Sequence, residues 1–427
     1  PATRTTKTMN PKIGYLIPEF PSQTHAFFWR EVEALRASGE SVRLFSTRRP
    51  APENCRHAFA PEATAQTTYL LPLPAFSALR MALRRPGGLL RSLRYVASLK
   101  ESGLWRKLKT LAYIPCAAGL AEQARADGVT HLHVHSCANS AHLAAMANRI
   151  SGLPYSLSLH GDLQVYGVDH RAKMQRAAFI APVTFPLKRQ VTREIGIPVH
   201  KIPVIRMGVN SDAFKPGPVK TQRNHLFRLV TVARLNPQKG HRYALQAIRA
   251  LLDKGYRVEY TIVGEGPERS RLERQVHELG LEAVVTFTGT QGEAEVCRLM
   301  QRADGFLLTS FGLGEAAPVS VMEAMACGLV PVCSRIGGTP ELISHGVDGF
   351  LVPQKDAAAI THAVERLILE PDARREMADA ARKRAEEQFD YRLHAARLRN
   401  EIRRNLRPAA YTPSQLSAHR PAYQNAR

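Results

Sequence analysis

Three histidines alternate in the segment "THLHVHS", where His131, His133 and His135 occupy every second position. If this segment is a β-strand, the three side chains share one face of the sheet. Neighbouring histidines on a strand can bind zinc, but the first and third would lie about 13 Å apart, so one ion could not use all three. We expect no nearby carboxylate or cysteine cluster to complete such a site, and we therefore expect no metal there.

Two carboxylates lie on either side of an expected helix start in the segment "TSFGLGEAAPVSVMEAMACG". Glu315 would lie in a loop after a strand, and Glu323 would lie one to two turns into a helix expected from Val319 to Cys327. The free N–H groups of that helix N-terminus could bind a phosphate or a sugar hydroxyl. Carboxylates at these two depths could hold two sets of hydroxyls on one ligand. The alternative is a capping carboxylate and a residue on the helix surface.

The elements that must position these residues alternate between short apolar strands and helical patterns, which predicts a parallel α/β fold. Expected strands of the first half lie at 12–17, 41–46, 131–136, 155–160, 178–183 and 201–206, with a helix at 24–38. Those of the second half lie at 227–234, 258–266, 283–289, 305–310 and 329–334. A linker rich in Pro, Gly and charge, residues 208–225, separates the halves. We expect two Rossmann-like domains, with ligands beyond the carboxyl ends of the strands.

The composition limits the function classes. The chain has 427 residues and a formal net charge of +22, which favours a partner of opposite sign: nucleic acid, an anionic membrane or phosphorylated ligands. Six scattered cysteines without a C-x-x-C pair fit a reducing cytoplasm. No signal peptide or membrane-spanning run is recognised, so we expect any membrane contact to be peripheral. The tail after residue 412 is expected to be loosely ordered.

A basic stretch at residues 80–110 interrupts the α/β alternation. It contains many Lys and Arg residues and a single Glu, interleaved with Leu, Tyr, Val and Trp105 at helical spacing. A basic amphipathic helix pair of this kind can lie on an anionic bilayer. An ordinary solvated helical face packed on the domain is the alternative.

Several motifs together resemble the retaining GT-B glycosyltransferases of glycosyltransferase family 4. Residues 315–328 fit the pattern E-x-x-P-x-x-x-x-E-A-M-A-x-G and continue into "GGTPELISHGVDGFLVP". The segment "VTVARLNPQKG" (230–240) is similar to the family's strand-to-loop motif with an arginine and a lysine. "IVGEGP" (262–267) and "VTFTG" (285–289) resemble strand ends that hold the nucleotide base, and "YSLSLHGDLQVYG" (155–167) resembles a strand ending in a histidine that meets the donor sugar.

The resemblance implies roles for particular residues. Arg234 and Lys239 would stabilise the negative charge on a departing nucleoside diphosphate. Glu315 would hold the sugar hydroxyls, Glu323 the ribose, and His160 the transferred hexose. The catalytic candidates are therefore His160, Arg234, Lys239 and Glu315, and the donor-binding candidates are Gly264, Gly289, Gly314, Ala316, Ala317, Pro318, Val319 and Glu323.

The first half resembles the exopolysaccharide branch of this family, which includes colanic acid and amylovoran enzymes. The segment "PEFPSQTHAFFWREVEAL" (18–35) departs from the family's Gly-Gly loop and is closer to the P-x-x-S-x-T-F pattern of that branch, and "VIRMGVNSDAF" (204–214) agrees with it. Thr24 could equally be the N-cap of the helix. The acceptor-side candidates are Ser22, Gln23, Thr24, His135 and Asp162.

The resemblance implies a GT-B fold with an acceptor-binding domain at 1–215, a nucleotide-sugar-binding domain at 216–395, and a helix and loose tail at 396–427. It implies transfer of a hexose from a UDP- or GDP-sugar to a glycan acceptor, with a lipid-linked oligosaccharide as the expected form. No cofactor is expected, and no metal, since the sequence contains no D-x-D pair. We expect a cytoplasmic location, with association to the inner face of the plasma membrane.

Two kinds of alternative remain open. A sugar-nucleotide epimerase or a phosphorylase would use the same fold without transfer to a glycan. A nucleic-acid-binding protein is suggested only by the net charge of +22. No aromatic platform or nucleic-acid motif supports binding to nucleic acid.

Overall fold

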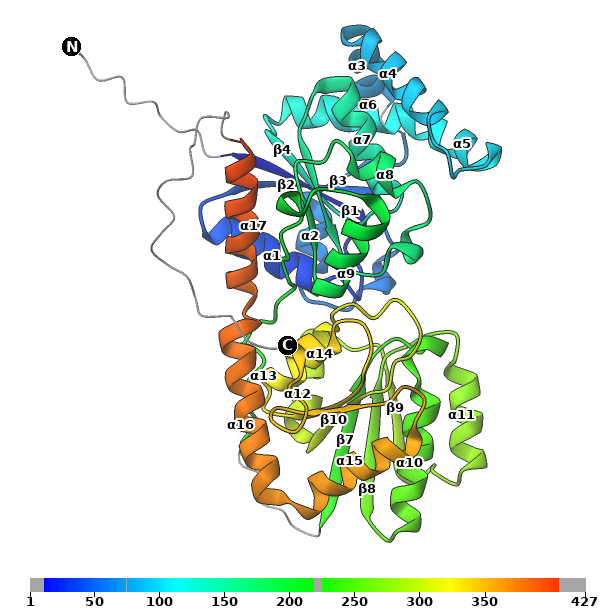
Figure 1. Cartoon of the computed structure of the whole chain (residues 1–427), viewed down its shortest axis with the longest axis vertical. Helices are drawn as coiled ribbons and strands as arrows, with labels where there is room; N and C mark the ends of the chain where they lie inside the picture. The colour runs from blue at the N-terminus through cyan, green and yellow to red at the C-terminus, as the bar shows by residue number, and fades with distance from the viewer. Residues whose placement is uncertain (1–10, 74, 219–224, 407–427) are drawn as a thin grey trace, which may run out of the picture.

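The computed structural model describes residues 11–73, 75–218 and 225–406. The expected loose tail after residue 412 and part of the expected linker at 208–225 lie outside the described residues. The described chain contains two six-stranded parallel sheets, one from each half of the sequence (Figure 1). This arrangement confirms the α/β fold expected from the alternation of strands and helices.

The first sheet has the strand order β3-β2-β1-β4-β5-β6. Its strands are β1 (Lys12–Glu19), β2 (Ser41–Arg48), β3 (Thr67–Tyr69), β4 (His131–His135), β5 (Tyr155–Leu159) and β6 (Ile180–Pro182). The helices of this half are α1 (Ala26–Ala37), α2 (Ala60–Gln66), α3 (Ala75–Arg84), α4 (Pro86–Ala97), α5 (Leu104–Leu111), α6 (Tyr113–Ala126), α7 (Asn139–Ser151), α8 (His170–Met174) and α9 (Phe185–Gln190).

The second sheet has the order β12-β11-β10-β7-β8-β9. Its strands are β7 (Leu226–Val232), β8 (Arg257–Val263), β9 (Val285–Gly289), β10 (Gly305–Leu308), β11 (Val330–Ser334) and β12 (Phe350–Val352). The helices of this half are α10 (His241–Asp253), α11 (Arg269–Glu278), α12 (Glu293–Arg302), α13 (Val319–Ala326), α14 (Thr339–Leu342), α15 (Ala357–Leu369), α16 (Pro371–Gln388) and α17 (Tyr391–Leu406).

Helices cover both faces of each sheet, and the strands are accordingly buried on both sides. In the first half, α6 and α7 pack on one face of the sheet and α1 on the other. In the second half, α12, α13 and α16 lie mainly on one face, and α10, α11 and α15 on the other. Strand β4 shows the alternation clearly, because Leu132 and Val134 point to α6 and α7 whereas its histidines point to the layer of α1.

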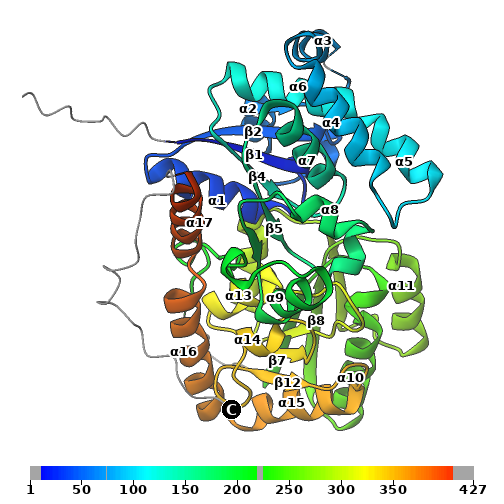
Figure 2. The same cartoon turned by 45° about the horizontal axis from the view of Figure 1, so that its top comes forward.

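The last helix belongs to the first half in space, although it follows the second half in sequence. Helix α17 packs against α1 through buried side chains such as Leu398 and Ile402, and Figures 1 and 2 show the two helices side by side. Shorter helical segments are the turns Pro52–Asn54, Leu163–Tyr166, Val199–Lys201 and Pro237–Lys239 and the wider turn Val191–Ile195. No helix among the described residues has both the length and the apolar character needed to cross a bilayer.

Some expected elements were wrong. Residues 201–206 form no strand; they run irregularly after a short turn, with Ile202 and Ile205 buried. Strands β3 and β12, each of three residues, were not predicted. The basic stretch forms three helices, α3, α4 and α5, rather than a pair. Helix α1 begins after His25, so Thr24 is not its N-cap.

Candidate functional site

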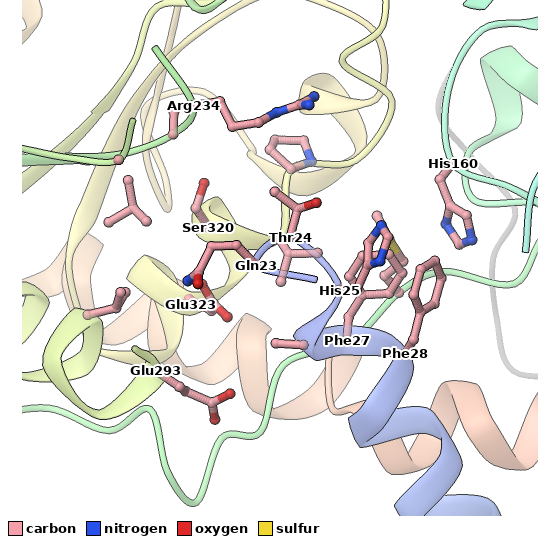
Figure 3. A pocket seen from close by; sticks show the side chains of 18 of the residues that line it. Gln23, Thr24, His25, Phe27, Phe28, His160, Arg234, Glu293, Ser320 and Glu323 are labelled. Atoms are coloured by element: carbon pink, nitrogen blue, oxygen red, sulfur yellow. The ribbon is translucent and has the colours of Figure 1, made fainter. Parts of the chain in front are cut away.

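A cavity of about 720 Å³ lies between the two halves of the molecule. Its volume falls within the range of small-molecule sites, roughly 300–1,000 Å³. The walls come from the carboxyl ends of β1, β4 and β5 on one side and of β7 and β8 on the other. This is the edge at which parallel sheets bind ligands. Figure 3 shows residues of both halves around the same space, with Thr24, His25 and His160 from the first half and Arg234 and Glu323 from the second.

Most of the residues predicted from the sequence meet at this cavity, although they are spread over 300 positions of the chain. From the second half, the predicted residues that line it are Arg234, Lys239, Gly264, Gly314, Glu315, Ala317, Pro318, Val319 and Glu323. From the first half they are Gln23, Thr24, His135 and His160. Four predicted residues lie outside the lining: Ser22, Asp162, Gly289 and Ala316.

The four residues outside the lining have identifiable contacts of their own. Ser22 Oγ lies 2.9 Å from Nδ1 of His25, and Asp162 accepts a 2.9 Å hydrogen bond from the backbone N–H of Gly314. The carbonyl of Ala316 accepts the N–H of Gly338, and that of Gly289 accepts the N–H of Gly264. These residues support the walls, and Asp162 joins the two halves directly.

The charges of the second half are arranged around Glu315. Lys239 Nζ lies 2.5 Å from Oε2 of Glu315, and the hydroxyl of Ser310 donates a 2.7 Å hydrogen bond to the same oxygen. Arg234 follows β7 and lines the cavity, and none of the described residues forms an ion pair with its guanidinium. The second half therefore contributes one cation that is already paired with a carboxylate and one that is open to an anionic ligand.

The loop that carries Glu315 rests directly on a glycine pair. A Cβ atom at Gly337 would lie 1.7 Å from the carbonyl oxygen of Glu315, and one at Gly338 would lie 2.2 Å from that of Ala316. Gly337 also has a positive φ of 52°, which favours glycine. Only residues without a side chain permit this approach, so the "GGTPE" segment positions Glu315 and the start of α13. Pro318, Val319 and Ser320 at that start line the cavity.

A buried ion-pair network connects the halves on the floor of the cavity. Arg30 of α1 lies 2.8 Å from Glu323 of α13 and 2.9 Å from Glu293 of α12, and Arg30 is 4% exposed. Burial raises the pKa of Glu323, and the charge of Arg30 opposes this shift. Glu323 was predicted from the sequence to lie at the site, whereas Arg30 was not. Nothing in the local pattern of α1 indicates that Arg30 pairs with Glu323, 293 positions away.

The three alternating histidines have different surroundings. His131 Nε2 and His133 Nδ1 both lie 2.7 Å from the hydroxyl of Ser156, and His133 Nε2 lies 3.0 Å from that of Ser158. Both rings are fully buried, and burial lowers the pKa of His131 to about 3. These two histidines are therefore neutral members of the core.

His135 instead reaches the predicted sugar-contacting residue. Its Nδ1 lies 3.0 Å from Nε2 of His160, and its Nε2 lies 3.2 Å from Oε1 of Glu31. The same Glu31 oxygen accepts a 2.7 Å hydrogen bond from the hydroxyl of Tyr15. Burial lowers the pKa of both histidines well below the usual value, so both rings are neutral at neutral pH.

This row of groups assigns a tautomer to His160. Oε1 of Glu31 lies 3.2 Å from Nε2 of His135 without hydrogen-bond geometry, and its negative charge favours the proton of His135 on that Nε2, which leaves Nδ1 as an acceptor. His160 then donates through Nε2, and its Nδ1 carries a lone pair. That Nδ1 is buried and has no hydrogen-bond partner among the described residues, in a side chain that lines the cavity. His160 can thus accept a hydrogen bond from a ligand hydroxyl.

The expectation that no carboxylate stands near the histidines was wrong. Potential ligand atoms of Glu31, His133 and His135 lie within 4.8 Å of one another. Glu31 is remote from β4 in sequence and comes beside it only because α1 packs on that face of the sheet. Tyr15 donates a hydrogen bond to Glu31, and Ser156 and Ser158 lie within hydrogen-bond distance of His133, whereas Nε2 of His135 has no hydrogen-bond partner among the described residues.

The sequence analysis also missed several residues that line the cavity. His25, Phe27 and Phe28 enter it from the start of α1, where the ring centroids of His160 and Phe27 are 5.2 Å apart (Figure 3). Burial, together with the nearby charge of Arg234, lowers the pKa of His25 to about 4. Phe27 and Phe28 have the spacing of core residues in an amphipathic helix. Their spacing therefore did not indicate a binding site.

Comparison with known proteins agrees with this geometry. Residues 219–384 match the family model Glycosyl transferases group 1. Over 412 residues the chain is 27% identical to the putative colanic acid biosynthesis glycosyltransferase WcaL of Escherichia coli K12, covering 90% of this chain and 97% of the relative. It is 38% identical over 177 residues to the amylovoran biosynthesis glycosyltransferase AmsK of Erwinia amylovora, covering 40% of this chain and 43% of the relative.

Solved structures share the same architecture. The crystal structure of Anabaena Alr3699/HepE in complex with UDP superposes with a TM-score of 0.71 at 17% identity, covering 92% of this chain and all of that one. A glycosyltransferase from Rickettsia africae superposes with a TM-score of 0.70 at 16% identity, covering 93% and 99%. The two facing sheets are thus the GT-B fold of glycosyltransferases. The second half of the chain is a glycosyltransferase group 1 domain, related to glycosyltransferases named for colanic acid and amylovoran biosynthesis.

Proposed function

We propose that the protein transfers a hexose from a UDP- or GDP-sugar to a glycan acceptor, with retention at the anomeric carbon, in the biosynthesis of a bacterial exopolysaccharide or cell-surface polysaccharide. The group 1 domain and the names of the relatives support this reaction. Similar folds have been solved with UDP and with UDP-glucose. The observation that carries the proposal is the convergence of Arg234, Lys239, Glu315 and the N-terminus of α13 on one cavity.

The donor diphosphate would bind where the positive groups meet. Arg234 offers a guanidinium without an ion-pair partner among the described residues, and the start of α13 offers free N–H groups. A diphosphate would also compete with Glu315 for Lys239, since the two side chains are paired in its absence. Glu315, once released, can accept hydrogen bonds from the sugar hydroxyls. Glu323 would meet the ribose beside Arg30.

The transfer step needs stabilisation of negative charge more than a protein nucleophile. The bond between the anomeric carbon and the phosphate oxygen breaks while the acceptor oxygen bonds to that carbon from the same face. The acceptor proton passes to the departing phosphate, whose charge Arg234 and Lys239 stabilise. Nδ1 of His160 would accept a hydrogen bond from a hydroxyl of the hexose and so fix the ring beside Glu315.

We further propose that the reaction is independent of metal ions and takes place in the cytoplasm, with a lipid-linked acceptor at the inner face of the membrane. The two side-chain cations supply the positive charge that a bridging metal supplies elsewhere. Transfer should therefore continue at its normal rate in excess chelator, and recovery only on addition of a divalent ion would contradict this part of the proposal.

The roles of Glu315 and Lys239 can be tested by substitution. A thermal-shift screen of UDP- and GDP-sugars identifies the donor, and turnover is then measured with a labelled donor. Glu315→Ala and Lys239→Ala should each lower kcat by at least about a hundredfold, because each removes a charged contact to the reacting groups. Lys254→Ala is the matched control, because Lys254 pairs with Glu365 on an exposed surface outside the cavity.

Product analysis separates transfer from the alternatives. A labelled sugar that appears in a larger glycan, with the anomeric configuration of the donor, supports the proposal. Conversion of the donor without an acceptor would identify an epimerase, and a dependence on inorganic phosphate would identify a phosphorylase. Near-normal turnover of Glu315→Ala would remove that residue from the mechanism.

A further inference from the structure

An exposed surface on helices α3, α4 and α5 combines large apolar side chains with basic ones. We call it the outer helical face; its apolar residues are Phe76, Leu79 and Leu83 on α3, Leu90 and Leu93 on α4, and Leu104, Trp105 and Leu108 on α5. Several are almost fully exposed, with Trp105 at 79%, Leu83 at 76% and Leu104 at 75%. Leu71 and Leu73, shortly before α3, are exposed as well, and the other exposed large apolar residues of the described chain, from Val165 to Leu393, lie singly along the sequence. A concentration of this kind on a water-soluble surface marks an interaction site.

The helices that carry the face are firmly attached to the protein. Helix α4 approaches α7 so closely that a Cβ atom at Gly88 would lie 2.6 Å from the Cα of Ile150. The Tyr95 hydroxyl lies 2.7 Å from Nδ1 of His142, and Arg149 lies over the Tyr95 ring. Helix α3 packs on α6 in the same way. The exposed apolar side chains therefore belong to helices that are packed on the domain. They do not belong to a loosely attached segment.

The charge around the apolar residues is almost entirely positive. From residue 75 to 111 the basic residues are Arg80, Arg84, Arg85, Arg91, Arg94, Lys100, Arg106, Lys107 and Lys109, and Glu101 is the single acidic residue. Arg80 and Arg84 pair with Glu122 of α6. Within the described chain, Arg85, Arg94, Arg106 and Lys109 have no acidic partner. The three helices thus carry exposed apolar side chains together with uncompensated positive charge.

We propose that the outer helical face docks on the surface of an anionic lipid bilayer. Amphipathic helices with Arg and Lys beside Leu, Phe and Trp insert their apolar side chains at the boundary between headgroups and acyl chains, and the cations contact the anionic headgroups. Trp105, in the first turn of α5, suits the boundary between headgroups and acyl chains, where tryptophan is enriched. A second copy of the chain is a poor occupant, because a two-fold contact through this face would place its positive charges against themselves.

The position of the face agrees with access to the cavity. Figures 1 and 2 show α3, α4 and α5 projecting from the first half, away from the second. The turn between α4 and α5 is tied to Asp169, which accepts hydrogen bonds from the N–H of Glu101 and the hydroxyl of Ser102. Residues 160–169 run from this contact to Asp162, which contacts Gly314 of the cavity wall, and to His160, which lines the cavity. A lipid-linked acceptor held at the bilayer would therefore approach along this segment.

The docking can be measured without any sugar transfer, so only the lipid-linked form of the acceptor rests on the proposed function. The full chain is floated with vesicles of phosphatidylcholine alone, and with vesicles of equal parts phosphatidylcholine and phosphatidylglycerol. Binding should be at least about tenfold stronger to the anionic vesicles and should weaken in high salt. Equal binding to both vesicles, or no binding to either, would overturn the proposal.

Two variants test the two components of the face. The pair Leu104→Ser and Trp105→Ser removes apolar contacts, and the pair Arg106→Glu and Lys109→Glu reverses charge; each should lower binding to anionic vesicles by about tenfold or more. All four residues are exposed, so the thermal midpoint should not change. The controls are Leu369→Ser, which is 62% exposed, and Arg271→Glu with Arg274→Glu on α11.

Further readouts separate the possible failures. Variants of the outer helical face should keep normal turnover with a water-soluble acceptor, whereas Glu315→Ala should lose turnover but keep lipid binding. Variants that float like the unmodified chain would overturn the docking proposal and leave the proposed transfer unaffected. A concentration-dependent dimer that Leu104→Ser and Trp105→Ser abolish would assign the face to a second copy instead.

Discussion

At the scale of single residues, the site depends on pairs that hold reactive groups in one state. Lys239 and Glu315 form an ion pair, which the proposed diphosphate would separate. His160 is oriented by His135, which in turn lies beside Glu31. A histidine in a neutral, assigned tautomer presents a defined acceptor to a ligand. The motif identified His160, but its hydrogen-bonding state comes from residues outside that motif.

We predict that Glu31→Gln impairs transfer through His160 without unfolding the protein. The amide of glutamine can donate to Nε2 of His135, which reverses the order of donors and leaves a proton on Nδ1 of His160. We expect kcat to fall by about tenfold or more, with little change in the KM of the donor, because the lost contact orients the reacting sugar. The ¹⁵N chemical shifts of the His160 ring report the tautomer directly.

Tyr15→Phe is the matched control for this prediction. It removes one donor to Glu31 but leaves the carboxyl oxygen beside His135, so the tautomer and kcat should be nearly unchanged. An unchanged ¹⁵N spectrum in Glu31→Gln would show that Glu31 does not set the state of His160.

At the scale of elements, glycines bring loops closer than any other residue would allow. The loop from 310 to 318 and the segment "GGTPE" touch through backbone atoms, with Gly337 directly behind the carbonyl of Glu315. The position of Glu315, the carboxylate that we propose holds the donor sugar, therefore depends on a contact between two loops. The outer helical face shows the same principle, because Gly88 lets α4 lie against α7 while its other side stays exposed.

We predict that Gly337→Ala displaces the loop of Glu315 and weakens transfer by at least about tenfold. The added methyl group would lie 1.7 Å from a backbone oxygen, so the loop must shift. Gly346→Ala provides the control, since Gly346 also has a positive φ, of 80°, but a Cβ atom there meets nothing within 4 Å. Both variants carry backbone strain of about 1 kcal/mol, and only Gly337→Ala should lose donor affinity in calorimetric titration.

At the scale of the whole molecule, the two halves meet through polar contacts around the cavity. Arg30 binds Glu293 and Glu323, Gln23 donates a 2.7 Å hydrogen bond to the carbonyl of Gln291, and Asp162 accepts from Gly314. Polar contacts of this kind can break and re-form when a ligand enters. They provide the means for domain closure, which would exclude water from a reactive donor.

We predict that Arg30→Met destabilises the protein by about 3–5 kcal/mol, because it leaves the buried Glu323 and the partly buried Glu293 without their counter-ion. The loss should appear as a lower midpoint in urea unfolding, together with weaker donor binding. Arg366→Ala, which breaks an exposed pair with Glu370, should cost less than about 1 kcal/mol. Adding Glu293→Gln to Arg30→Met should recover part of the lost stability, because it removes the repulsion between Glu293 and Glu323. If the double variant is as unstable as Arg30→Met alone, this repulsion is not the cause of the destabilisation.

The sequence by itself determined the features that are encoded locally. The alternation of apolar strands and helices specified two parallel sheets, and the motifs placed Arg234, Lys239, Glu315 and Glu323 at strand ends and a helix start. The basic amphipathic pattern around Trp105 also appeared in the sequence. Hydrophobic periodicity and helix-start signals extend over a few residues, so they can be recognised in the sequence without knowledge of the fold.

Only the tertiary structure decided which residues of the two halves meet. Arg30 beside Glu323, Glu31 beside His135, and Gly337 beneath Glu315 depend on how α1, β4 and the loop of α13 pack, and no local pattern specifies such pairs. The same holds for the exposed side of α3, α4 and α5, because an amphipathic helix shows in sequence that it has two faces but not which of them is covered. Packing contacts between distant segments are set by the whole fold.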